Sequence, residues 1–253
     1  MRCPTYSARV AEQWWHRAEL GRFLDAALVR PVPRDHTESD DAFRRRRWVA
    51  AVTAAAGSVL LWASFRLEPG DRRFYLTTVA LALVWVVGSL ASGPLHLGWA
   101  NTRRGHRLAR PVVQSLALGV LAVGLFTAGA LIVARLPMLR NSVNDVLDHA
   151  RFGSLPVVAA ITLINGLAEE LFFRGALFAA IGRRHPVAIS TALYTLTTVF
   201  SLNLMLVVAA AVLGVVVGLQ RRVTGGVLGP MITHVTWSLS MLLILPPLIT
   251  ALT

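Results

Sequence analysis

The chain has 253 residues, of which 55% are hydrophobic and only 15% are charged. Soluble domains carry about 25% charged residues, and the apolar residues here gather in blocks of about 18 or more, which is the length of a membrane span. The composition therefore excludes a soluble globular protein. The net charge of +12 comes from arginine alone, because no lysine occurs. The arginines flank the apolar blocks, a pattern that orients membrane proteins, so we predict no nucleic-acid binding.

The first 43 residues differ from the rest of the chain. They contain no apolar core of signal-peptide type, so we expect no cleaved leader. Apolar residues from Val10 to Leu28 recur at helical spacing, which predicts either an amphipathic helix on the membrane surface or a cytoplasmic helix packed on the domain. Residues Pro31 to Asp41 predict a linker. Cys3 is the only cysteine, which excludes an internal disulfide and a cysteine-cluster metal site.

Seven apolar segments follow, and they predict an all-α fold, a polytopic transmembrane helical bundle of about seven to eight spans. A short turn near Leu202 predicts that the fifth and sixth segments form a tight hairpin. The segments are 48–65, 74–95, 111–134, 156–181, 186–201, 204–220 and 227–252. We divide the chain into a cytoplasmic amphipathic segment with its linker (1–43), N-terminal transmembrane helices (44–150) and a C-terminal transmembrane domain (151–253).

The arginines predict an orientation. A cytoplasmic N-terminus places twelve flanking arginines inside and six outside, as the positive-inside rule requires. We therefore expect a multi-pass protein of the cell membrane, bacterial in origin, with its C-terminus outside. The inner group consists of Arg44–Arg47, Arg103, Arg104, Arg107, Arg110, Arg183, Arg184, Arg221 and Arg222.

From Arg151 to the C-terminus the chain has only two acidic residues, Glu169 and Glu170, and both lie inside an apolar segment. An ionisable group at that depth costs at least about 2.5–3.5 kcal/mol, so the pair is a candidate site. Glu170 and Arg174 are four residues apart and can pair on one helix face. Glu169 lies on another face, with Asn165 beside it, and we expect it to face a cavity as a general base. The alternative is an ion pair that only fixes helix packing, with Glu169 hydrated in a crevice.

The last apolar segment carries a second polar pair. His234 and Ser238 are one helical turn apart and share a face of the helix. A histidine inside a span is also a common packing residue. Its presence in the same domain as the two glutamates favours a functional role.

These residues carry a resemblance to a known family. Glu169 and Glu170 with Arg174 and the following glycine resemble the first motif of the CAAX-processing and bacteriocin-processing (CPBP, also called Abi) intramembrane proteases. The stretch 224–238 resembles their last motif, in which a histidine is followed four residues later by asparagine or another polar residue. The resemblance covers residues 150–245.

The resemblance implies that residues 151–253 form the catalytic core of an endopeptidase that hydrolyses peptide bonds inside the bilayer, as CAAX prenyl proteases do. It implies that Glu169 activates water and that His234 and Ser238 stabilise the oxyanion. The middle motif, Phe-x-x-x-His, corresponds here to the stretch from Tyr194 to Thr198, which has threonine at the histidine position. Threonine cannot exchange a proton at neutral pH as imidazole does, so we expect reduced activity. Asn203 and His96 are the nearest candidates to replace the histidine.

The family is often labelled metalloprotease. A catalytic zinc takes three protein ligands plus water, and once Glu170 is assigned to Arg174 only Glu169 and His234 remain as good ligands within the spans. We therefore predict no metal and no other cofactor.

The expected partners are membrane lipid and an unidentified protein substrate that is membrane-embedded or lipid-anchored. One alternative function is a catalytically silent scaffold or immunity-type protein of the same fold. Another is a transporter with a glutamate proton relay. Such relays usually spread ionisable groups over several helices, whereas here nearly all of them lie on one.

Overall fold

The computed structural model describes residues 19–34, 36–68, 71–101, 108–151 and 154–252. The described chain is almost entirely helical, apart from a two-stranded antiparallel pairing of β1 (Ala100–Asn101) with β2 (Leu108–Ala109). Its helices are η1 (Asp25–Val29), α2 (Asp40–Ser64), α3 (Arg72–Ser92), α4 (Val112–Val133), α5 (Pro137–Arg151), α6 (Leu155–Glu170), η2 (Leu171–Leu177), α7 (Phe178–Ile181), α8 (Pro186–Val199), α9 (Leu204–Thr224) and α10 (Leu228–Leu252).

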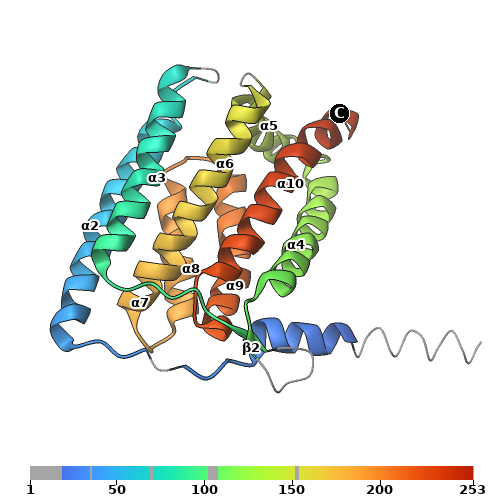
Figure 1. Ribbon diagram of the computed structural model, residues 1–253. Coiled ribbons are helices and arrows are strands. Elements are labelled where there is room, and N and C mark those ends of the chain that lie inside the picture. Colours follow the sequence, from blue (N-terminus) through green and yellow to red (C-terminus); the bar gives the residue numbers. More distant parts are fainter. Residues whose placement is uncertain (1–18, 35, 69–70, 102–107, 152–153, 253) are drawn as a thin grey trace, which may run out of the picture.

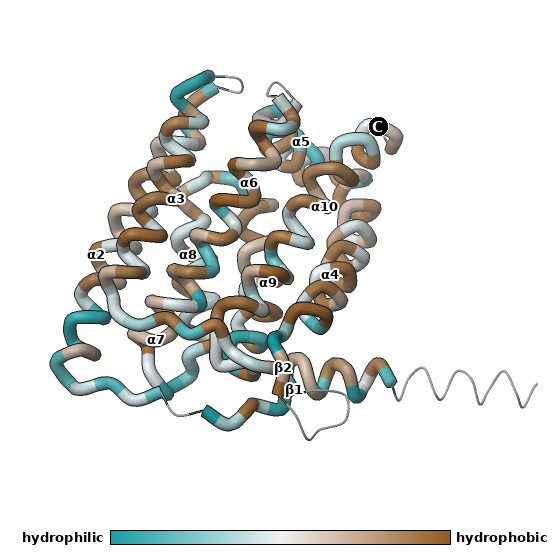
Figure 2. Tube along the Cα trace, in the orientation of Figure 1, coloured by the Kyte–Doolittle hydropathy of each residue, from teal (hydrophilic) through white to brown (hydrophobic). Residues whose placement is uncertain are grey.

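Six of the helical segments are long and apolar enough to cross a membrane. They are α2, α3, α4, the continuous run Leu155–Ile181, α9 and α10. The fifth predicted span, 186–201, corresponds to α8, which is apolar but has only 14 residues. Hydrophobic residues cover the helices along their length, and hydrophilic ones gather at the start of α2 and around the start of α3 (Figure 2). The predicted all-α membrane bundle is confirmed.

The helices form two layers (Figure 1). In one layer α2 packs on α3, α3 on α6, α6 on α10 and α10 on α4. The second layer is the α8–α9 hairpin, and α9 also packs on α10. The predicted tight turn between α8 and α9 is present, and its Leu202 has a left-handed backbone with φ of 58°. The two glutamates stand at the end of α6, where the two layers meet.

Two extended stretches cross the lower end of the bundle in Figure 1 and bind the α9–α10 turn. The amide of Val32 donates to the carbonyl of Val223, and the amide of Val227 donates to the carbonyl of His96, both at 2.9 Å. Gly226 is required at this crossing, since a Cβ there would lie 2.0 Å from the carbonyl carbon of Leu97. The predicted linker is thus hydrogen-bonded to the turn. The predicted amphipathic helix falls largely on residues 1–18, outside the described residues, but residues 19–29 are helical.

One helix was missed by the sequence analysis. α5 occupies the loop between the third and fourth apolar segments, where no element was predicted. Val143 and Leu147 bury their side chains against Ala134 and Ile249. The carboxamide of Asn203 donates to the carbonyl of Ser142 at 2.7 Å.

An aromatic cluster fills the space between α3 and η2. The indole of Trp85 stacks on Phe172, with ring centroids 4.6 Å apart, and meets Phe173 at 5.1 Å. All three side chains are buried. Gly57 on α2 lies directly against the indole, so that a Cβ at this position would come within 2.0 Å of Trp85. The α2–α3 contact therefore depends on a glycine.

We predict that Gly57→Ala destabilises the bundle, because the added methyl can only be accommodated if the indole moves. Overpacking of this kind costs about 1–3 kcal/mol. Thermal unfolding in detergent, followed by loss of monodisperse protein, measures the effect. Gly124→Ala is the matched control, since a Cβ at Gly124 would meet nothing within 4 Å. Equal stability of the two variants would contradict the packing described for Trp85.

Candidate active site

The buried ion pair at the end of α6 is the centre of the site. Glu170 and Arg174 are both fully buried, and Nη1 of Arg174 lies 3.2 Å from Oε1 of Glu170. The contact expected from the four-residue spacing is present. Between the two residues the α-helix changes to the π-helix η2, which begins at Leu171. Local π-helical turns are frequent at functional sites.

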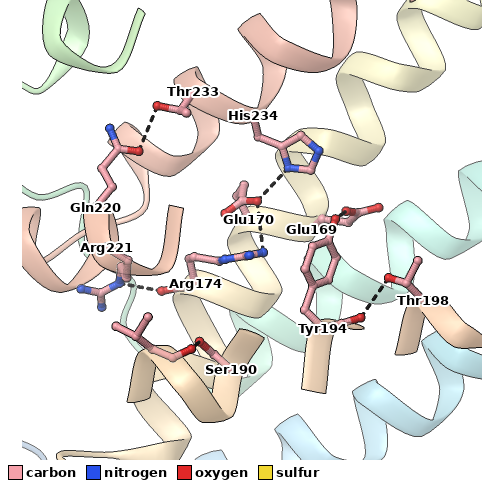
Figure 3. Close-up of polar contacts among 11 residues, drawn as sticks. Glu169, Glu170, Arg174, Ser190, Tyr194, Thr198, Gln220, Arg221, Thr233 and His234 are labelled. Atoms are coloured by element: carbon pink, nitrogen blue, oxygen red, sulfur yellow. Dashed lines mark hydrogen bonds and ion pairs between the residues drawn. The ribbon is translucent and has the colours of Figure 1, made fainter. Parts of the chain in front are cut away.

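His234 from α10 joins the same carboxylate. Its Nδ1 lies 2.7 Å from Oε1 of Glu170, so one oxygen is shared by imidazole and guanidinium (Figure 3). The resemblance implied a role for His234 at the oxyanion, and no contact with Glu170 was predicted. The structure places His234 against Glu170, and this contact links α10 to α6.

Glu169 points away from this cluster, as its position on the helix predicted. It lines a cavity of about 200 Å³ that His234, Tyr194 and Thr198 also line. The rest of the wall is largely apolar and comes mainly from α2, α3, α8 and α9. Oε2 of Glu169 accepts a hydrogen bond of 2.7 Å from the Tyr194 hydroxyl. The cavity thus combines one carboxylate with an apolar wall, an arrangement typical of small ligand sites.

Three further predicted site residues have different placements. Thr198 lines the cavity as expected, but its hydroxyl donates to the backbone carbonyl of Tyr194 at 2.9 Å. Ser238 donates to the carbonyl of Val235 at 3.4 Å and lies beside Gly166 of α6, and it is not among the residues that line the cavity. The side-chain amide of Asn165, which was placed on the face of Glu169, donates to the carbonyl of Ile161 at 3.0 Å.

The two candidate replacements for the family histidine do not lie in the cavity. Asn203 caps α9, where its side-chain oxygen accepts from the amides of Met205 and Leu206 at 3.1 Å. His96 lies at the lower end of the bundle and stacks on His36 at 3.6 Å. Burial there, together with the positive charges of neighbouring arginines, lowers the pKa of His96. Neither side chain serves the site around Glu169.

The donor set does not fit a catalytic metal. Among the described residues no group of three or more histidine, cysteine, aspartate or glutamate side chains is placed to hold an ion. Glu170 is engaged by Arg174 and His234. A three-ligand zinc site has no counterpart around Glu169, and we derive no step through a metal.

Two residues that hydrogen-bond to the site, Tyr194 and Arg221, were not predicted as site residues. Tyr194 was noted only as the first residue of the middle-motif stretch, where the family has phenylalanine. Arg221 was counted only as a loop charge. Its Nε donates to the backbone carbonyl of Arg174 at 2.6 Å, and its guanidinium lies over the ring of Phe178. The departure at the phenylalanine position was a usable signal for Tyr194, whereas no sequence feature placed Arg221.

A family model described as Rce1-like, type II CAAX prenyl endopeptidase, matches residues 151–240. This stretch runs from the end of α5 into α10 and contains both glutamates, Tyr194 and His234. The match confirms the resemblance to CAAX-type proteases. No curated protein and no solved structure gives a significant match.

We predict that Arg174→Ala strongly lowers the yield of folded protein. Removing one partner of a buried ion pair strands the other charge and costs about 3–5 kcal/mol. Size-exclusion chromatography and thermal unfolding in detergent measure the loss. Arg184→Ala, at an exposed arginine, is the matched control. Replacing both Glu170 and Arg174 by leucine should cost less than Arg174→Ala alone; a larger cost would show that the pair is more than a structural contact.

Proposed function

We propose that this chain, whose residues 151–240 match the Rce1-like family model of CAAX prenyl endopeptidases, is an intramembrane endopeptidase that uses Glu169 to activate water. The observation that carries the proposal is the division of the two glutamates. The carboxylate of Glu170 contacts both Arg174 and His234, whereas Glu169 lines a cavity within the bundle. A carboxylate is costly at this depth, and Glu169 has no ion-pair partner among the described residues that would explain its presence as structural.

The reaction is hydrolysis of a peptide bond by one water molecule. The free oxygen of Glu169 takes a proton from water while the water oxygen attacks the carbonyl carbon of the substrate. The electron pair of the carbonyl moves to its oxygen, and the tetrahedral intermediate carries an oxyanion. As the intermediate collapses, the C–N bond breaks and the proton on Glu169 passes to the leaving nitrogen. The products are a carboxylic acid and an amine.

His234 is the group best placed to stabilise the oxyanion. It lines the cavity, and its Nδ1 is occupied by Glu170. In the protonated form of the ring, Nε2–H remains for the substrate, and a pre-oriented donor of this kind stabilises developing charge. Ser238 was assigned a share of this role by the resemblance. Because its hydroxyl is directed to a carbonyl of its own helix, we assign the role to His234 alone.

The substrate enters a largely apolar environment. Residues from α2, α3 and the α8–α9 hairpin line the cavity, including Leu61, Leu81 and Leu213. A peptide segment that is membrane-embedded or lipid-anchored fits this wall. Thr198 supplies no proton-exchanging group at the family's histidine position, so we expect slower turnover than in relatives that have the histidine.

We predict that Glu169→Gln abolishes cleavage and leaves the fold intact, because the amide cannot accept the proton of water. Purified protein in proteoliposomes is incubated with a library of CAAX-terminated peptides, with and without a prenyl group, in water enriched in ¹⁸O. Mass spectrometry should find one ¹⁸O atom in each new carboxyl group. Glu68→Gln, at an exposed glutamate outside the cavity, is the control. Activity that survives Glu169→Gln would reject the mechanism, and an inactive wild type would favour the scaffold or immunity role.

We further propose a cytoplasmic N-terminus and an external C-terminus. The start of α2, the end of α7 and the α9–α10 turn lie at one end of the bundle (Figure 1). Nine of the twelve arginines assigned to the inside lie in the described residues, and all nine belong to this end. A cytoplasmic location for this end follows from the positive-inside rule.

Reporter fusions test the orientation. A reporter fused after residue 253 should be active only outside the cytoplasm, and one fused in the loop after α7 should be active only inside. The reverse pattern would reject the orientation. A cytoplasmic signal from both fusions would mean that the number of crossings is even.

A further inference from the structure

The middle motif of this chain departs from Phe-x-x-x-His at both ends. Thr198 replaces the histidine, and Tyr194 replaces the phenylalanine. The Thr198 hydroxyl donates its one proton to the carbonyl of Tyr194, so this proton is used within α8. Position 198 therefore provides neither an acid–base group nor a donor for Glu169.

The residue one turn earlier provides the missing donor. The phenolic oxygen of Tyr194 lies 2.7 Å from Oε2 of Glu169. Positions four apart on a helix share a face, and Tyr194 and Thr198 both line the cavity. The family has its polar side chain, a histidine, at the position of Thr198, whereas this chain has a phenol that reaches Glu169 at position 194.

The ring of Tyr194 is held on two sides. Phe173 meets it at 4.6 Å between centroids, and the guanidinium carbon of Arg174 lies 4.5 Å from its centre. The side chain is only 8% exposed. Arg174 is itself fixed by Glu170, so the structural ion pair also orients the phenol that reaches Glu169. A donor with so little freedom holds the carboxylate in one rotamer.

We propose that Tyr194 is a positioning residue that takes the place of the family's histidine at Glu169. By donating to Oε2 it turns the second oxygen of Glu169 toward the water and the substrate in the cavity. A phenol keeps its own proton at neutral pH, so Tyr194 orients the base and does not share its proton. This inference rests on the proposed function. It also explains how a site without the histidine keeps a productive carboxylate.

The test is Tyr194→Phe, which removes only the hydroxyl and restores the residue type of the family motif. The ring contacts with Phe173 and Arg174 remain, so the fold should be retained. We expect kcat on the cleaved peptide to fall by about 10²-fold, the cost of a misplaced catalytic group, with KM unchanged. Tyr75→Phe on α3, which is not among the cavity residues, is the matched control and should leave kcat and KM unchanged.

A rescue separates positioning from a purely structural role. Adding Thr198→His to Tyr194→Phe rebuilds the complete family motif and should recover kcat. This recovery should disappear when Glu169→Gln is also present. An infrared difference spectrum between wild type and Tyr194→Phe should show a shifted carboxylate band that is absent from the Tyr75→Phe difference.

Each outcome decides the inference. Unchanged kcat in Tyr194→Phe, a change in KM alone, or no recovery in the double variant would overturn it while the proposed hydrolysis stands. A wild type that cleaves no peptide of the library would overturn the proposed function and this inference with it.

Discussion

The structure depends on a buried ion pair within an apolar bundle. Glu170 and Arg174 are buried together with the imidazole of His234, and either charge alone would carry a large desolvation cost. Their contacts tie α10 to the end of α6. Arg221 extends the cluster by donating to the carbonyl of Arg174, which brings the end of α9 to the same place. The end of α6, the end of α9 and α10 are therefore all held at Glu170 and Arg174.

This constraint also gives the two adjacent glutamates different surroundings. A shift of one residue on a helix turns a side chain by about 100°, so Glu169 cannot enter the cluster that holds Glu170. It faces the cavity, where the Tyr194 hydroxyl is its hydrogen-bond partner. Two adjacent carboxylates thus have different surroundings, Glu170 in the ion pair and Glu169 at the cavity, and the helix geometry produces this difference.

The sequence could predict those features that depend on local composition and residue spacing. Long apolar blocks predicted the spans, and the four-residue spacing predicted the Glu170–Arg174 contact. α5 was not predicted because its charged residues, among them Arg140 and Asp145, interrupt any apolar block. The burial of its apolar side chains also depends on Ile249 of a distant helix. The partner of His234 was missed for the same reason. Which carboxylate an imidazole meets depends on the relative depth of α6 and α10, which no local pattern records.

Comparing the motif position by position gives an incomplete picture of the site. Position 198 by itself indicates a lost function, since threonine replaces a proton-exchanging residue. The same helix face gains a hydroxyl at position 194, four residues or about 6 Å away along the axis, and that hydroxyl contacts the carboxylate of Glu169. The two substitutions therefore act together, because the surroundings of Glu169 depend on which polar atoms reach its carboxylate and not on which position of α8 supplies them. With both departures Glu169 keeps a hydrogen-bond donor on α8, whereas Thr198 combined with phenylalanine at position 194 would leave it without one on this face.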